Sequence, residues 1–295
     1  MESLLKRLAA GEILVCDGAM GTFLQARGLQ PGACPELWCV DRPDDVRAIH
    51  ASYRDAGSDI VECNSFGGTS YKLNHYGLSG TVEEINRCAA ELARDVADGR
   101  QYVLGSMGPT GEFMEPYGEA TQAEFVAAFA QQARALEAGG ADLAIVETMT
   151  ALEEAAAAVK AIKEETRLVA MVSFTFDPQL NGGYATMMGV TPEAFATAAL
   201  EMGADVIGAN CGTGPDDMIK VVAALRATAP ETPIIAMPNA GMPVIEDGQT
   251  VFKETPTEMA AKVPLLVAAG ANIIGGCCGT SPAHIAAMKQ AAAAL

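Results

Sequence analysis

Three cysteines in the second half of the chain have the spacing of a metal site. Cys277 and Cys278 are adjacent and lie between glycines, and Cys211 lies between Asn210 and Gly212. Three thiolates can hold a zinc ion and leave its fourth position open for a substrate, whereas a structural zinc site is usually closed by four protein ligands. The alternatives are two buried apolar cysteines or a strained vicinal disulfide, because free cysteine is among the most buried residue types.

The adjacent pair also constrains the backbone. Neighbouring side chains on a β-strand point to opposite faces, so Cys277 and Cys278 reach one metal ion only where the chain leaves its strand. The flanking glycines of the run 275–279 permit that departure. We therefore expect the pair to follow the end of a strand.

The elements that must position these cysteines form an internal repeat. In four segments a glycine follows a helical pattern, then comes Asp or Asn, then an apolar run typical of a buried parallel strand. These segments are 56–62, 139–147, 202–208 and 269–275, and four more apolar runs lie between them at 13–16, 102–104, 168–173 and 234–237. Helical patterns separate the runs, for example at 123–138 and 192–201.

Eight strands alternating with helices predict an α/β fold, a single (β/α)8 TIM barrel over residues 1–295. An open doubly wound sheet is the alternative, and the even eightfold spacing disfavours it. Active sites of the barrel fold lie at the carboxyl ends of the strands. The polar residues at these ends are Asp17, Glu62, Asn64, Ser106, Glu147, Asn210, Cys211, Asn239, Cys277 and Cys278. Because the three cysteines all fall there, the metal site is favoured over a core pair.

Three of the polar residues each have two interpretations. Asp17, followed by two glycines within four residues, either faces a ligand or caps the next helix. Glu147 ends an apolar run, and a buried carboxylate needs a cationic partner, which is either a ligand ammonium or a lysine or arginine. Asn239 suits a turn as well as a polar wall of the site.

Composition excludes several classes of protein. The chain has 37 acidic and 19 basic residues, a formal charge of −18, so nucleic acid is an unexpected partner. Eight cysteines in 295 residues are not a disulfide framework, which indicates a reducing, cytoplasmic setting. Residues 1–7 hold no apolar segment, and no run reaches about 18 apolar residues, so we expect neither a signal peptide nor a membrane span.

The remaining cysteines and the histidines suggest little chemistry. Cys34, Cys39 and Cys88 lie away from strand ends and are expected to be structural, whereas Cys16 and Cys63 lie near the mouth. None of the three histidines belongs to the Asp-x-His-x-x-Gly pattern of a cobalamin lower ligand. No glycine-rich dinucleotide or phosphate loop follows a strand.

Several motifs together resemble the homocysteine S-methyltransferase family, over about residues 11 to 289. The segments that carry the resemblance are 17–22, 64–68, 105–111, 210–211, 238–241 and 275–280. Within the family, 72–78 and 83–86 are most similar to the homocysteine-binding domain of cobalamin-dependent methionine synthase. The folate-binding, cobalamin-binding and reactivation modules of that enzyme are not in this sequence. Either the sequence is one domain of a larger enzyme, or it is a stand-alone protein to which a partner corrinoid protein supplies methylcobalamin.

The resemblance implies a role for each site residue. It places zinc on Cys211, Cys277 and Cys278 and the ammonium of homocysteine at Glu147 and Asp17. It also implies that the backbone at Gly21 and Thr22 holds the substrate carboxylate, and that Asn64, Ser106 and Asn239 complete the substrate pocket. A thiol with a pKa near about 8.5 is only partly ionised at neutral pH, and coordination to zinc deprotonates it.

Three functions follow as hypotheses. The first is a zinc-dependent methyltransferase that moves a methyl group from a methyl-corrinoid protein to homocysteine and forms methionine. The second is a self-contained enzyme of the same family that uses S-methylmethionine or a betaine-like donor. The third is a thiol-binding or zinc-binding module without catalysis.

Overall fold

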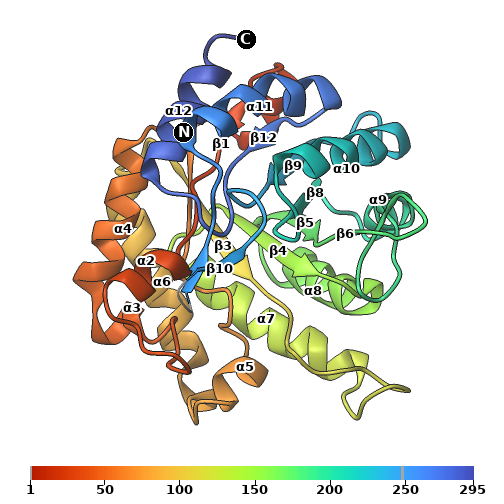
Figure 1. The fold of residues 1–295 in the computed structure, drawn as a ribbon. Coiled ribbons are helices and arrows are strands. Elements are labelled where there is room, and N and C mark those ends of the chain that lie inside the picture. The colour runs from red at the N-terminus through yellow and green to blue at the C-terminus, as the bar shows by residue number, and fades with distance from the viewer. Residues whose placement is uncertain (1, 247–248) are drawn as a thin grey trace.

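Eight parallel strands close into a barrel in the computed structural model, which describes residues 2–246 and 249–295 (Figure 1). The strands are β1 (Leu14–Val15), β2 (Ile60–Glu62), β3 (Tyr102–Met107), β4 (Leu143–Met149), β5 (Val169–Phe174), β8 (Val206–Asn210), β9 (Ile234–Met237) and β12 (Ile273–Ile274). Their order is β1-β12-β9-β8-β5-β4-β3-β2, and a bridge between Cys16 and Ile60 joins the two ends. The predicted (β/α)8 TIM barrel is confirmed.

Helices surround the barrel and cover its outer face (Figure 1). They are α1 (Leu4–Ala9), α2 (Gly21–Ala26), α3 (Trp38–Asp41), α4 (Pro43–Asp55), α5 (Ser70–Asn74), α6 (Val82–Ala97), α7 (Gln122–Ala138), α8 (Leu152–Glu165), α9 (Pro192–Glu201), α10 (Pro215–Thr228), α11 (Pro256–Ala269) and α12 (Pro282–Ala292), with a 3-10 turn η1 (Ser79–Thr81). Both helical patterns expected at 123–138 and 192–201 are helices, α7 and α9. Within the described ranges, no helix combines the length and the hydropathy needed to cross a lipid bilayer.

Alternate residues of each strand separate two apolar layers. One layer fills the barrel and includes Leu14, Ile60, Tyr102, Leu104, Leu143, Ile145, Met171, Val206, Ile235 and Ile273. Their strand neighbours, such as Val15, Val61 and Val103, pack in the layer under the helices. Helix α1 adds Leu4 and Leu8 to the interior layer, so it closes the amino-terminal end of the barrel.

The repeated Gly-x-Asp/Asn segments have a structural role at that amino-terminal end. Each glycine ends a helix with a positive φ, between 75° and 118° at Gly57, Gly140, Gly203 and Gly270. The acidic or amide side chain two residues later accepts the N–H at the start of an adjacent barrel strand. These pairs are Asp59 with Val15 (2.8 Å), Asp142 with Val103 (2.9 Å), Asp205 with Ala170 (2.8 Å) and Asn272 with Ile234 (3.0 Å).

At the opposite end, the structure differs from the sequence prediction in two respects. Strand β3 continues to Met107 instead of ending near Leu104, because Gly105, Ser106 and Met107 still pair with β4. Two antiparallel hairpins, which the sequence did not predict, follow strands β5 and β9 (Figure 1). They are β6 (Asp177–Pro178) with β7 (Tyr184–Ala185), and β10 (Val244–Glu246) with β11 (Gln249–Val251).

The side-chain acceptors of the repeat should matter for stability and not for chemistry. We expect Asp205→Ala to lower the free energy of unfolding by about 1–3 kcal/mol, because it leaves the Ala170 N–H without its acceptor. Asp205→Asn keeps an acceptor, as Asn272 does in the fourth repeat, and should cost clearly less. Urea unfolding of the two variants measures the difference. If both variants lose the same unfolding free energy, the loss comes from the ion pair between Asp205 and Lys163, which both substitutions remove.

Candidate functional site

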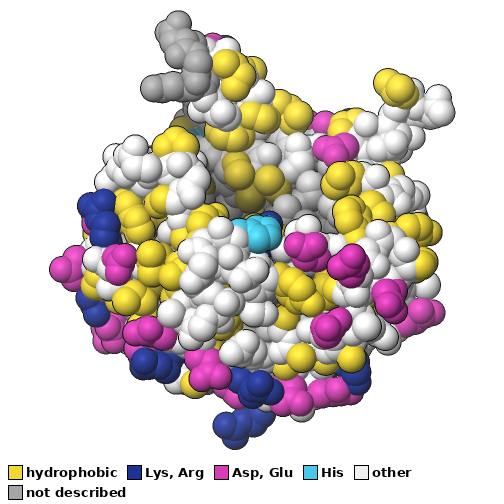
Figure 2. Space-filling view, turned by 90° about the horizontal axis from the view of Figure 1, so that it is seen from below, with side chains coloured by type: hydrophobic (Ala, Val, Ile, Leu, Met, Phe, Trp, Pro, Cys, Tyr) yellow, Lys and Arg dark blue, Asp and Glu magenta, His cyan; other side chains and the backbone are white. Residues whose placement is uncertain are grey.

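A pocket of about 320 Å³ lies at the carboxyl ends of the barrel strands. Its walls come from the segments after β1, β2 and β12 and from side chains of β3, β4 and β9. Figure 2 shows the molecule hollowed between two projections, with hydrophobic side chains on the walls of the hollow. The volume suits a small molecule, since ligand pockets begin at about 300 Å³.

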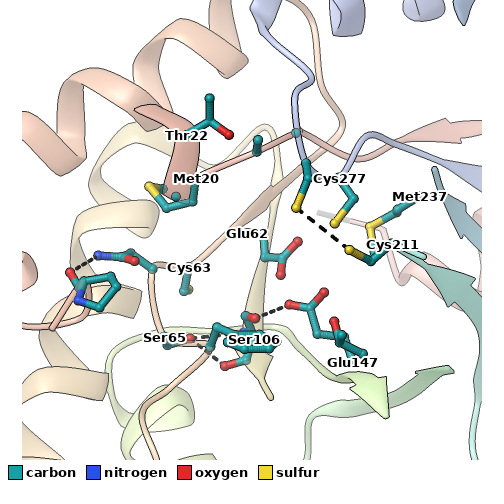
Figure 3. Close-up of a pocket in the computed structure, with 18 of the residues that line it drawn as sticks. Met20, Thr22, Glu62, Cys63, Ser65, Ser106, Glu147, Cys211, Met237 and Cys277 are labelled. Carbon is teal, nitrogen blue, oxygen red and sulfur yellow. Dashed lines mark hydrogen bonds between the residues drawn. The ribbon is translucent and has the colours of Figure 1, made fainter. Parts of the chain in front are cut away.

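Three sulfur atoms meet on one side of this pocket (Figure 3). The Sγ atoms of Cys211, Cys277 and Cys278 all lie within 4.8 Å of one another, and those of Cys211 and Cys278 are 3.8 Å apart. A tetrahedral zinc ion with Zn–S bonds of about 2.3 Å holds its sulfur ligands about 3.8 Å apart. The three thiols therefore fit a metal ion that keeps one position open toward the pocket.

Local backbone geometry directs Cys277 and Cys278 to the same place. Strand β12 ends at Ile274, so the pair follows a strand end, as expected. Beyond it, the Cys277 N–H donates to Pro238 O (2.9 Å), and Cys278 O accepts from Ala240 N–H (3.0 Å). Gly276 is required here, because a Cβ at this position would lie 2.4 Å from Thr280 Oγ1.

Cys211 reaches the pocket through an unusual backbone conformation. It follows the last residue of β8 and has a φ of 57°, in the left-handed region that non-glycine residues rarely adopt. Such a residue costs roughly 1–3 kcal/mol and persists where the surroundings hold it. Here its N–H donates to Met237 O (3.1 Å) on the adjacent strand.

The three thiols influence one another's ionisation. Contact with the thiols of Cys277 and Cys278 lowers the pKa of Cys211. The same contact raises the pKa of Cys277 and of Cys278. The cluster thus favours loss of a proton from one of its sulfur atoms, which suits binding of a metal ion.

Carboxyl groups form the opposite side of the pocket. Glu62 and Glu147 line it, and Asp17 lies behind Glu62, whose N–H it accepts through Oδ2 (2.9 Å). Burial raises the pKa of Asp17 to about 8, and burial with the charge of Glu147 raises the pKa of Glu62 well above its usual range. None of the three carboxyl groups forms an ion pair with a lysine or arginine in the parts of the chain that the structure describes. The alternative that a lysine or arginine is the cationic partner of Glu147 therefore finds no support.

Hydrogen bonds fix the direction of Glu147. The Ser106 hydroxyl donates to Oε1 (Figure 3). The Asn210 amide donates to Oε2 (3.0 Å). The pairing register of β4 with β5 shifts between Val146 and Met149, which marks a β-bulge. Because of this bulge both Glu147 and Thr148 line the pocket, although adjacent residues of a regular strand would face opposite ways.

A second cluster of possible ligands lies deeper. Cys16, Asp17 and Glu62 each bring one ligand atom within 4.8 Å of the others. Burial raises the pKa of all three groups, so they retain protons instead of presenting the anionic donors that metal ions prefer. We assign no ion to them.

The residues proposed for the substrate fall into two groups. Gly21, Thr22, Asn64, Ser106 and Glu147 line the pocket. Asp17 and Asn239 are buried just outside its lining, at 2% and 4% exposure. The side-chain amide of Asn64 is engaged with Pro35 O (2.8 Å), whereas Asn239 Oδ1 has no hydrogen-bond partner among the described residues.

Other residues of the pocket were not in the predicted substrate set. Glu62 was recognised at a strand end but given no role, although it lies two residues after the inward Ile60 and therefore faces inward. Glu36 and Met20 reach the pocket from loops. The Glu36 carboxylate accepts the Gly67 N–H (2.7 Å) and the Cys34 thiol (3.3 Å), contacts that no local sequence pattern indicates.

Known proteins resemble the chain over its whole length. It is 35% identical to the methionine synthase of Mycobacterium tuberculosis over 96% of this chain and 24% of that protein, and 35% identical to that of Mycobacterium leprae over 99% and 25%. The chain thus spans about a quarter of the length of these relatives.

Solved structures of one homocysteine methyltransferase also resemble the chain over nearly its whole length. The homocysteine methyltransferase MmuM from Escherichia coli, in its metallated form, is 26% identical with a TM-score of 0.79, over 97% of this chain and 98% of that one. Its oxidised form is 27% identical with a TM-score of 0.80, over 98% and 99%. The family model for homocysteine S-methyltransferase matches residues 14–292. The chain belongs to the homocysteine S-methyltransferase family.

Proposed function

We propose that residues 1–295 act as one homocysteine-binding barrel domain that transfers a methyl group to the thiol of homocysteine and forms methionine, with zinc held by Cys211, Cys277 and Cys278. The observation that supports this proposal most is the pairing, in one pocket, of three clustered sulfur atoms with carboxyl groups that form no ion pair with any described lysine or arginine. The sulfur cluster, with a metal ion bound, suits a thiol, and the carboxyl groups suit an ammonium. Homocysteine carries both groups.

Zinc is the metal that the donor set fits best, since soft thiolates in a tetrahedral arrangement select it. The metallated form of the Escherichia coli homocysteine methyltransferase supports a metal here. When bound, zinc would keep an incoming thiol ionised at neutral pH. Three cysteine thiolates would leave more electron density on the attacking sulfur than neutral histidine ligands would. That electron density favours attack on a methyl group.

The remaining residues would bind the amino-acid end of the substrate. Glu147, fixed by Ser106 and Asn210, would accept the ammonium, with the carboxyl groups of Asp17 and Glu62 close behind it. The backbone at Gly21 and Thr22, in the first turn of α2, would donate to the carboxylate. Asn239, whose Oδ1 has no hydrogen-bond partner among the described residues, would form a polar wall of the site.

We propose a methyl-corrinoid protein as the methyl donor. The methionine synthases that resemble this chain are about four times its length, which leaves room in them for modules besides a barrel of this kind. Loops around the mouth expose large hydrophobic side chains, as a protein-binding face would. These include Phe113, Tyr117 and Met187, with exposed fractions of 58%, 85% and 80%.

The eight free cysteines support a cytoplasmic setting.

A self-contained enzyme is the second candidate. The homocysteine methyltransferase of Escherichia coli matches the chain over nearly its full length, so a barrel of this size needs no further module in that protein. S-methylmethionine or a betaine-like compound would then be the donor.

The donor can be tested by direct assay. Homocysteine and the zinc-loaded chain should give methionine slowly with free methylcobalamin and much faster with a methylated corrinoid protein, because docking supplies effective molarity. Efficient turnover with S-methylmethionine and no protein partner would establish the second candidate instead. Homocysteine binding without transfer from any donor would indicate a non-catalytic module.

The three thiols can be tested separately from activity. We expect Cys211→Ala, Cys277→Ala and Cys278→Ala each to lower the zinc content from about one ion per chain and to remove activity, while circular dichroism stays native. Cys88→Ala, on α6, is the matched control and should keep both zinc and activity. Full zinc occupancy in Cys277→Ala or Cys278→Ala would contradict the assignment.

The buried carboxyl groups should make the stability depend on pH. The folded state raises the pKa of Asp17 from 3.8 to about 8, so the stabilising contribution of its protonated form is present below pH 4 and is lost as the pH rises through 8. Asp17→Asn stays neutral, so without homocysteine it should exceed the wild type in unfolding free energy by on the order of 1–5 kcal/mol more at pH 8 than at pH 5. Thermal melting at both pH values measures this. Parallel pH profiles would show that Asp17 ionises normally.

A further inference from the structure

Asn210 is placed between the two halves of the pocket. It is the last residue of β8, it is fully buried, and the next residue is Cys211. Its side chain turns away from the sulfur cluster toward the bulge of β4, where it contacts Glu147 and Thr148. One strand end therefore serves the sulfur side through Cys211 and the carboxyl side through Asn210.

Every hydrogen-bonding position of the Asn210 amide is used. Oδ1 accepts from Thr148 N–H (2.9 Å) and from the Ser173 hydroxyl (2.7 Å). Nδ2 donates to Thr148 Oγ1 (2.8 Å) and to Glu147 Oε2 (3.0 Å). An amide offers two donors and two acceptor positions, so this side chain can have only one orientation.

The bulge needs such a partner. Thr148 has a φ of 58°, and a left-handed conformation is a strong outlier for a β-branched residue. The bulge also interrupts the strand ladder at Thr148, between Val146 and Met149. The Asn210 side chain replaces the missing strand acceptor for the Thr148 N–H and at the same time binds the carboxylate of the preceding residue, Glu147.

We propose that Asn210 is a positioning residue that sets the selectivity of the pocket for a thiol bearing an α-ammonium group. It acts through Glu147, by holding the bulge that directly follows this inward carboxylate and by fixing one of its oxygens. This inference rests on the proposed function, in which Glu147 binds the ammonium of homocysteine.

The test compares two ligands that differ by one group. Homocysteine and 4-mercaptobutyrate have the same thiol, chain length and carboxylate, and only homocysteine has the ammonium. Calorimetric titration of the zinc-loaded protein measures both. Asn210→Ala should weaken homocysteine by roughly tenfold or more, the size expected for a lost hydrogen bond to a charged group, and change 4-mercaptobutyrate by less than about threefold. Its zinc content should equal that of the wild type.

Two further variants make the result decisive. Ser173→Ala removes a contact with the same Oδ1 and none with Glu147 or Thr148, so it should leave the ratio of the two affinities unchanged. Asn210→Ser, which keeps a hydroxyl near the bulge and cannot reach Glu147, serves if Asn210→Ala does not fold and should show the same selective loss. Equal weakening of both thiols, or selective loss in Ser173→Ala as well, would overturn the role of Asn210.

Glu147→Gln separates failure of this inference from failure of the proposed function. If Glu147→Gln weakens only homocysteine and the Asn210 variants do not, the ammonium site stands and the role of Asn210 is wrong. If Glu147→Gln affects both thiols equally, the ammonium is not bound at Glu147, and the proposed substrate orientation is wrong together with the inference.

Discussion

The strict alternation of side chains along a closed barrel is the constraint on which the site depends. A residue faces the interior only if it lies an even number of positions from another interior residue on its strand. Ile60, Leu104 and Ile145 fill the barrel, so Glu62, Ser106 and Glu147 face inward two positions later. The alternation that builds the apolar core thus also directs these polar side chains into the barrel. They lie at the carboxyl ends of the strands, just beyond the apolar residues.

The sulfur side of the pocket requires departures from that alternation. Two adjacent cysteines cannot share a face of a strand, so the chain leaves β12 before Cys277, with Gly276 packed too closely on Thr280 to carry a side chain. Cys211 adopts a left-handed φ, and so does Thr148 across the pocket. Both unusual residues lie at the mouth, where backbone strain is held by neighbouring strands and supports function instead of packing.

These two mechanisms explain how far the sequence could predict the structure. Periodicity and the repeated Gly-x-Asp/Asn segments depend on local chemistry, so the barrel and most of its strands were predictable, although the end of β3 was not. The meeting of Cys211 with Cys277 and Cys278 was predictable as well. The inward direction of Glu62 could have been derived from Ile60 by the same rule. The bulge at Thr148 and the contact of Glu36 with Gly67 depend on partners far along the chain, and no local pattern encodes them.

The electrostatics of the pocket follow from the same geometry. Alternation brings Glu62 and Glu147 to the mouth of the barrel, with Asp17 behind Glu62, and burial raises the pKa of Asp17 and of Glu62. A lysine beside these carboxyl groups would favour their ionised forms, but it would also occupy the space of a ligand. In the part of the chain that the structure describes, no lysine or arginine pairs with them. In the proposed function, the ammonium of an amino acid would supply the cation that the carboxyl groups do not find in the described residues.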